Sequence, residues 1–172
     1  GPEDPYFDYG DSNQTVTYTE DTLVNVFDVN ASDFENQTRI YGLTGNGEDD
    51  ANFSINPSTG VVTFNSPPDY ENPWGGNDIN PTNRYVLEVN ATDDISTPNK
   101  IRHYVIVNVQ NVIEPPSFVN GSSFSINIWE NNTAGGKASY DINVTTQDTN
   151  QSLVLEISGG ADQNKFSLNT AT

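Results

Sequence analysis

The apolar and polar positions of the chain alternate with a period of two. Runs of strand-like length carry this pattern at residues 15–19, 23–29, 60–64, 84–91 and 102–109. Such alternation is typical of strands that bury one face and expose the other, and no stretch has the 3.6-residue period of an amphipathic helix. The pattern therefore predicts an all-β fold.

Clusters of turn-forming residues separate these runs. Segments rich in Asn, Asp, Gly, Ser and Pro occupy residues 45–50, 56–60 and 65–77. They supply turn chemistry at the spacing of a β-sandwich, in which short strands follow one another closely. We therefore expect a Greek-key β-sandwich of about seven strands.

The chain also contains an internal repeat. The motif E-x-P-x-F at Glu3 to Phe7 recurs 111 positions later at Glu114 to Phe118, and Glu20 is answered by Glu130. Two further pairs of segments match in spacing, 29–35 with 144–150 and 53–59 with 166–172. The repeat predicts one complete domain at residues 3–113. It predicts the N-terminal half of a second domain at residues 114–172.

Half of a sandwich would leave apolar strand faces and an unpaired edge exposed. Such surfaces favour pairing with another chain. A dimer in which two copies complete each other by strand exchange is therefore one expectation for this protein.

The charge of the chain limits its partners. Twenty-four acidic residues against six basic ones give a formal net charge of −18, which disfavours nucleic acids and anionic membrane surfaces. No apolar run approaches the roughly 20 residues of a membrane-spanning helix, so direct membrane insertion is not expected. Cysteine is absent, which leaves oxygen ligands and makes hard cations the natural partners.

Acidic residues recur at the ends of the predicted strands. They are Glu20, Asp33, Glu35, Asp69, Glu71, Asp93 and Glu114. Calcium takes six to eight oxygen ligands from such groups, whereas the simplest alternative is that each acid only solvates a loop. These acids recur in both copies beside the same E-x-P-x-F joint, which favours calcium binding. Repulsion between the carboxylates would loosen the joint, and bound calcium would stiffen it.

Several motifs occur together in a fixed order. They are V-x-A-x-D-x-E at 29–35, F-S-I-N-x-x-T-G-x-V-x-F at 53–64, D-Y-E at 69–71, V-x-A-x-D at 89–93 and N-V-I-E-P-P-S-F at 111–118. In these motifs the chain resembles cadherin repeats, specifically the cadherin-like tandem domains of large microbial surface proteins. The resemblance covers the whole chain and implies an extracellular or cell-surface adhesion module that binds calcium between successive repeats.

The resemblance also implies the calcium ligands. The junction set would be Glu20, Asp69, Glu71, Asn111, Glu114, Asp148 and Asn150. Asp33, Glu35 and Asp93 would instead face a preceding repeat. The animal linker pattern D-x-N-D-N-x-P-x-F is not fully kept, because Asn111 and Ile113 stand where a carboxylate and an amide are expected. One or two ions are therefore expected, with other cadherin-like domains, a surface protein or a surface polysaccharide as partner.

Two functions other than a calcium-binding adhesion module would also use residues of this chain. An accessory carbohydrate-binding module would use the loop residue Trp74 as an aromatic anchor. A glycosidase would use Asp69 and Glu71 across a sugar cleft, for which a repeat of this size has little room. The single histidine, His103, has no evident nucleophile or orienting acid and is expected at the surface or on an edge strand. We therefore predict a protein that is not an enzyme.

Overall fold

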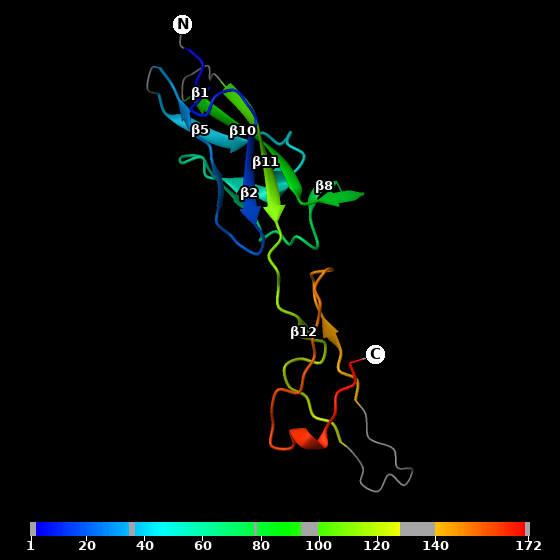
Figure 1. Cartoon of the computed structure of the whole chain (residues 1–172). Helices are drawn as coiled ribbons and strands as arrows, with labels where there is room; N and C mark the ends of the chain where they lie inside the picture. Colours follow the sequence, from blue (N-terminus) through cyan, green and yellow to red (C-terminus); the bar gives the residue numbers. More distant parts are fainter. Residues whose placement is uncertain (1–2, 35–36, 78, 94–99, 128–139, 171–172) are drawn as a thin grey trace. The chain divides into compact units, whose positions relative to one another are not determined.

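The computed structural model describes residues 3–34, 37–77, 79–93, 100–127 and 140–170 (Figure 1). The chain divides into two compact units, residues 1–112 and 113–172, and each is described by itself. Within the described residues, no helix is long and apolar enough to cross a membrane.

The first unit is a sandwich of two sheets. One sheet has the order β2 (Gln14–Thr19), β11 (Lys100–Gln110), β10 (Arg84–Asp93) and β5 (Arg39–Leu43). The other has the order β3 (Asn25–Asp28), β7 (Val61–Phe64) and β6 (Phe53–Ile55). These seven strands confirm the predicted all-β sandwich.

Shorter elements complete the described part of this unit. They are the strand pair β1 (Tyr6–Phe7) and β4 (Ala31–Ser32), the hairpin β8 (Gly75–Asn77) and β9 (Asn80–Thr82), and the 3-10 helix η1 (Asp50–Asn52). Strand β8 falls within the segment that the sequence marks as turns.

The strand register separates the two ends of the four-stranded sheet. Strand β2 runs parallel to β11, with Thr19 opposite Gln110, whereas β10 is antiparallel to β11. Residues that follow β2 therefore lie at the end where β11 stops and β10 begins. Asp93, the last residue of β10, lies at the opposite end, about 30 Å away along the strand.

The core lies between the two sheets and follows from the alternation. The inward residues of β10 and β11 that are buried in it are Tyr85, Leu87, Val89, Ala91, Val105, Val107 and Val109. Phe64 of β7 packs against Phe53 and Tyr85, with ring centroids 4.3 and 5.1 Å away. The contact between Phe64 and Tyr85 of β10 joins the two sheets.

His103 is buried, so its expected surface position is wrong. Its ring lies 5.4 Å from that of Phe7 and 5.5 Å from that of Tyr9. The alternation explains the difference. Arg102 and Tyr104 point outward, so the residue between them points into the core.

A loop, and not a strand, completes one edge of β10 with both backbone and side-chain groups. Backbone N–H groups of Thr44 and Asp49 donate to the carbonyl oxygens of Glu88 and Val86, both at 2.9 Å. In return, the carboxylate of Asp49 accepts the N–H of Val86 at 2.7 Å, and that of Asp50 accepts the N–H of Glu88 at 2.8 Å. Because these N–H groups have acceptors, β10 can continue past the end of β5.

Asp50 also fixes the loop that precedes it. Its second carboxylate oxygen accepts the N–H groups of Gly45 at 2.7 Å and Gly47 at 3.1 Å. A Cβ at Gly47 would lie 2.4 Å from the backbone nitrogen of Glu88 and 2.2 Å from the Asp50 carboxylate. The loop therefore needs glycine at this point of close approach.

The described part of the second unit contains little regular structure. Strands β12 (Ser117–Phe118) and β13 (Val144–Thr145) form an antiparallel pair, and η2 (Gln163–Lys165) is a short 3-10 helix. Among the described residues of this unit no apolar side chain is buried. Several of its described apolar side chains, Phe166 among them, are open to solvent.

The same local structures recur in the two units. Phe118 pairs with Val144 as Phe7 pairs with Ala31. The η2 helix, like η1, is followed by an extended phenylalanine, Phe166 in place of Phe53. The side chain of Phe53 is 4 % exposed in the core, whereas that of Phe166 is 64 % exposed.

The strand pairing aligns the two units differently from the sequence match of 29–35 with 144–150. It makes Val144 the counterpart of Ala31, whereas the sequence match pairs Val144 with Val29.

Candidate metal site

Glu20 follows the first strand of the four-stranded sheet and turns its carboxylate into the protein. Its side chain is 1 % exposed. One carboxylate oxygen accepts the N–H of Tyr70 at 2.5 Å, and the other accepts the N–H of Val112 at 2.6 Å. Glu20 therefore joins β2 to two segments that are distant in sequence.

The backbone turns sharply at Asp21, directly after Glu20. Asp21 adopts a left-handed conformation with φ 55°, which Asp tolerates better than most residues. Its N–H donates to the carbonyl of Pro68 at 3.0 Å. This contact places the segment after β7 beside the end of β2.

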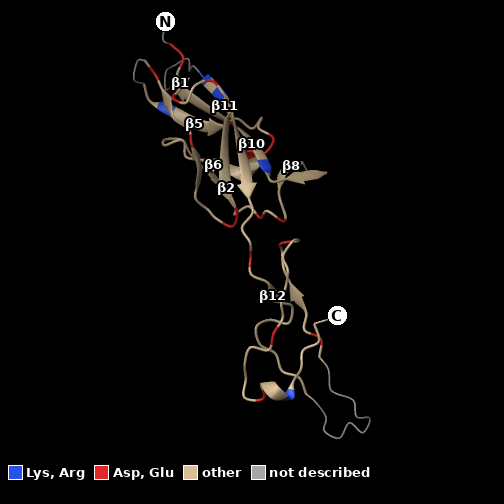
Figure 2. Cartoon of the chain, viewed as in Figure 1, with Lys and Arg blue, Asp and Glu red and all other residues tan. Residues whose placement is uncertain are grey.

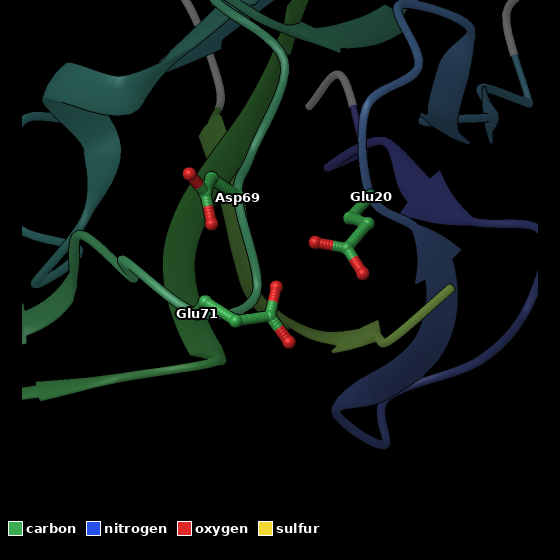
Figure 3. A group of neighbouring side chains, drawn as sticks. All are labelled: Glu20, Asp69 and Glu71. Atoms are coloured by element: carbon green, nitrogen blue, oxygen red, sulfur yellow. The ribbon is translucent and has the colours of Figure 1, made fainter. Parts of the chain in front are cut away.

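Asp69 and Glu71 come from that segment, and Figure 3 shows both near Glu20, with the side chain of Glu71 extending toward it. Each of the three residues offers a carboxylate oxygen, and these oxygens all lie within 4.8 Å of one another. Two oxygens bound to one calcium ion can be at most about 5 Å apart, because each lies about 2.3–2.6 Å from the ion. The three carboxylates therefore fit one ion. We call this group the Glu20 cluster.

Two further contacts order the cluster. Asn111 donates from its side-chain nitrogen to Glu71, and the N–H of Asn72 donates to Asp69 at 2.9 Å. Asn111 therefore lies beside Glu71, and its role as a ligand stays a prediction.

The Glu20 cluster concentrates like charge in a small volume. At an effective dielectric constant near 20, two carboxylates at about 4.8 Å repel each other by roughly 3–4 kcal/mol. Asp69 and Glu71 are half-buried, so solvent screens this repulsion only in part. A divalent cation would convert the repulsion into attraction.

Two other predicted ligands, Asp33 and Asp93, belong to the opposite end of the first unit. Asp33 and Asp93 are both buried, and Arg39 is the register partner of Asp93. Glu35 lies outside the described residues, as does Glu130, the repeat counterpart of Glu20. This end stays a predicted site.

The remaining predicted ligands belong to the second unit. The N–H of Glu114 donates to the carboxylate of Asp148 at 2.8 Å, and the side chain of Gln151 donates to the carbonyl of Glu114 at 3.0 Å. Asp148 is buried, whereas Asn150 is exposed. The structure thus brings Glu114 and Asp148 together.

Trp74 lies directly before β8 and is 39 % exposed. Its backbone N–H donates to the hydroxyl of Tyr85 at 3.1 Å, which fixes the backbone while the indole remains accessible. Exposure of one aromatic ring does not define a ligand site.

Sequence reasoning did not single out Glu88, on the outer face of β10. The residue is 4 % exposed, and its carboxylate accepts hydrogen bonds from the Thr44 hydroxyl and from Asn46 Nδ2, the latter at 3.3 Å. The Thr44 hydrogen bond, aided by Asn46, lowers the pKa of Glu88 against the opposing effect of burial. Hydrogen bonds to the charged form of a carboxyl group favour that form.

We expect Glu88→Gln to destabilise the first unit by about 1–2 kcal/mol at neutral pH. Because the folded-state pKa is lowered, this contribution is present above the ordinary carboxyl value and is lost as the pH falls through the folded value. Urea unfolding from pH 7 to pH 3 would measure it. The exposed Glu48→Gln serves as control, and a wild-type–variant difference that does not shrink in acid would contradict the expectation.

The fold and the Glu20 cluster together define a class of protein, namely an all-β sandwich repeat with carboxylates gathered at one end. The family model described as Cadherin domain matches residues 14–110, more than half of the chain. The chain therefore belongs to the cadherin family. Cadherin domains are extracellular adhesion modules and are typically not enzymes.

Relatives and solved structures extend this match. The chain is 26 % identical over 149 residues to the rat protein cadherin EGF LAG seven-pass G-type receptor 3, covering 87 % of this chain and 4 % of that protein. Human CDH23 EC21–23 has a TM-score of 0.55 at 19 % identity, covering 84 % of this chain and 46 % of that chain. Drosophila N-cadherin EC1–4 has a TM-score of 0.52 at 24 % identity, covering 69 % and 28 %.

These named proteins come from animals, so the microbial subtype stays a prediction. The chain spans a small part of the rat protein and less than half of either solved chain. The likeness to the solved structures, at low sequence identity, concerns the fold alone.

Proposed function

We propose that this chain is a calcium-binding adhesion module in which the metal stiffens the joint between successive repeats. The observation that carries the proposal is the convergence of Glu20, Asp69 and Glu71. Glu20 is distant in sequence from the other two, yet the oxygens of all three lie close together. Their spacing fits the ligand sphere of one calcium ion.

The ligand chemistry favours calcium over softer or smaller cations. Carboxylate and amide oxygens are hard ligands, and the chain contains no cysteine. Magnesium demands a nearly ideal octahedron and retains several waters, whereas calcium accepts irregular sets of oxygens. We propose Asn111 as a further ligand on the first unit.

The joint itself is proposed from the order of residues along the chain. Val112 donates to Glu20, so the polypeptide that leaves the Glu20 cluster continues directly into the predicted linker. Glu114, Asp148 and Asn150 are the ligands we propose beyond it. Of these, Glu114 and Asp148 are already hydrogen-bonded to each other.

The domain assignment remains part of this proposal. We propose that residues 3–113 form one repeat and that residues 114–172 form the N-terminal half of a second. The shared β1–β4 and β12–β13 pairings, and the two 3-10 helices that precede Phe53 and Phe166, support this assignment.

For partners and location, the family supports extracellular adhesion through other cadherin domains. A surface protein as partner and a strand-exchanged dimer stay predictions. So does the carbohydrate-binding alternative centred on Trp74.

Calcium titration of chelator-treated protein tests the proposal. We expect binding in the range of extracellular modules, roughly 0.1–1 mM. The variant Asp69→Asn with Glu71→Gln should bind at least about tenfold more weakly, because two charged ligands are lost. Isothermal titration calorimetry measures both affinities.

A matched control separates the site from general charge. The variant Asp11→Asn with Glu48→Gln makes the same substitutions at two exposed positions of the first unit. It should bind calcium like the wild type. If both double variants weakened calcium binding equally, the loss of affinity would be explained by net charge alone. If neither weakened it, Asp69 and Glu71 would not be calcium ligands.

A further inference from the structure

A second polar site lies on the outer face of the four-stranded sheet. A hollow of about 340 Å³ is lined by Thr44, Asn46, Lys100 and Arg102. The chain has only six basic residues, and two of them line this hollow. Figure 2 shows the basic residues as few blue segments in a chain marked throughout by red acidic ones.

The strand register explains why these side chains gather. Lys100, Arg102 and Tyr104 alternate along the outward face of β11, and Tyr104 is the register partner of Glu88 on β10. Thr44 and Asn46 lie in the loop after β5. Both donate to the Glu88 carboxylate, which holds this loop against the outer face of β10. Two basic groups and two small polar groups therefore surround one buried acid.

Glu88 holds this site in a defined arrangement. The residue is more than nine-tenths buried, and its carboxylate fixes both the hydroxyl of Thr44 and the amide of Asn46. Lys100 and Arg102 are the basic groups that line the hollow. Glu88 and Asp50, whose carboxylate accepts the N–H groups of Gly45 and Gly47 on either side of Asn46, are the acids nearest to it.

We propose that this hollow binds an acidic saccharide. Lys100 and Arg102 would take its carboxylate or sulfate group, since guanidinium and ammonium groups pair strongly with such anions. Thr44 and Asn46 offer the hydroxyl and amide chemistry that sugar hydroxyls need. Tyr104 is 38 % exposed beside them, and its ring adds an aromatic face.

The size of the hollow agrees with a small sugar unit. Ligand pockets range from about 300 to 1,000 Å³, and this one is near the lower limit. An acidic peptide could satisfy the two basic residues, but it would make less use of the polar pair and the exposed ring. The proposal is independent of calcium binding at the Glu20 cluster.

NMR titration of ¹⁵N-labelled full chain with a glucuronate-containing tetrasaccharide tests the proposal. Calcium-free buffer prevents a metal-bridged contact at the Glu20 cluster. We expect the largest shift changes at Asn46, Glu88 and Arg102. Arg102→Gln should weaken binding roughly tenfold, because it removes one charge-assisted pair.

Arg84→Gln is the matched control. It removes the same charge from an exposed position of β10 that does not line the hollow, and it should change the affinity less than about twofold. A hexaglutamate peptide and an uncharged tetrasaccharide complete the design. Equal binding of the peptide or of the uncharged sugar, equal weakening by both variants, or no binding of the acidic sugar would each overturn the proposal.

Discussion

Replacing Glu20 by alanine is expected to abolish calcium binding and also to lower the stability of the calcium-free protein. The carboxylate is buried and accepts the N–H groups of Tyr70 and Val112 at 2.5 and 2.6 Å. Alanine would leave both donors without this acceptor, at a cost of about 2–4 kcal/mol in the free energy of unfolding. Glu20 would thus serve both as a ligand and as a structural acceptor.

Urea unfolding with and without calcium separates the two effects. For a dissociation constant of roughly 0.1–1 mM, about 10 mM calcium should stabilise the wild type by roughly 1.4–2.7 kcal/mol. The Glu20→Ala protein should gain almost nothing. Glu20→Gln keeps the side-chain size and one acceptor oxygen, so it should retain more stability while losing most of the calcium effect.

Two outcomes would contradict this expectation. If Glu20→Ala gained as much stability from calcium as the wild type, Glu20 would not be a ligand. If its calcium-free stability were unchanged, water would have replaced both hydrogen bonds and the carboxylate would not fix the end of β2.

Asp50→Ala is expected to have the second large effect, with no change in the calcium ligands. Asp50 accepts three backbone N–H groups, those of Gly45, Gly47 and Glu88. Because the residue is buried, its removal should destabilise the first unit by about 3 kcal/mol. For a domain of this size, the melting temperature should fall by roughly 15 °C.

Hydrogen exchange locates the effect of this substitution. The amides of Gly45 and Glu88 should exchange faster in Asp50→Ala, whereas amides near the Glu20 cluster should change less. Asp11→Ala, at an exposed position, should stay within about 0.5 kcal/mol of the wild type. A loss below about 1 kcal/mol for Asp50→Ala would mean that solvent satisfies the freed N–H groups.

Most of the sandwich could be predicted because its strands alternate between buried and exposed residues. The predicted run 102–109 lies within β11, and 84–91 lies within β10. The β8–β9 hairpin was not foreseen, because its Gly, Pro and Asn content is that of a turn. The edge formed by Asp49 and Asp50 was also missed, because side chains that replace a strand leave no periodic signal.

The Glu20 cluster was predicted from the family resemblance and not from the alternation of apolar and polar residues. Alternation cannot bring Glu20 next to Asp69, because the two are distant in sequence and their proximity depends on the turn after β2. The family resemblance supplied that grouping. It could not reveal the hollow at Arg102, whose two hydrogen-bonding residues, Thr44 and Asn46, come from a loop between strands.

The parallel pairing of β2 with β11 has a consequence for how the chain folds. Gln14 lies opposite Val105. This edge of the sheet therefore closes only after about 90 intervening residues have been made, which takes roughly 5–20 s at usual rates of synthesis. Sheets built from such distant contacts fold slowly. During synthesis, the early strands must therefore wait with their apolar faces uncovered, a stage at which a chaperone or a neighbouring nascent chain has access to them.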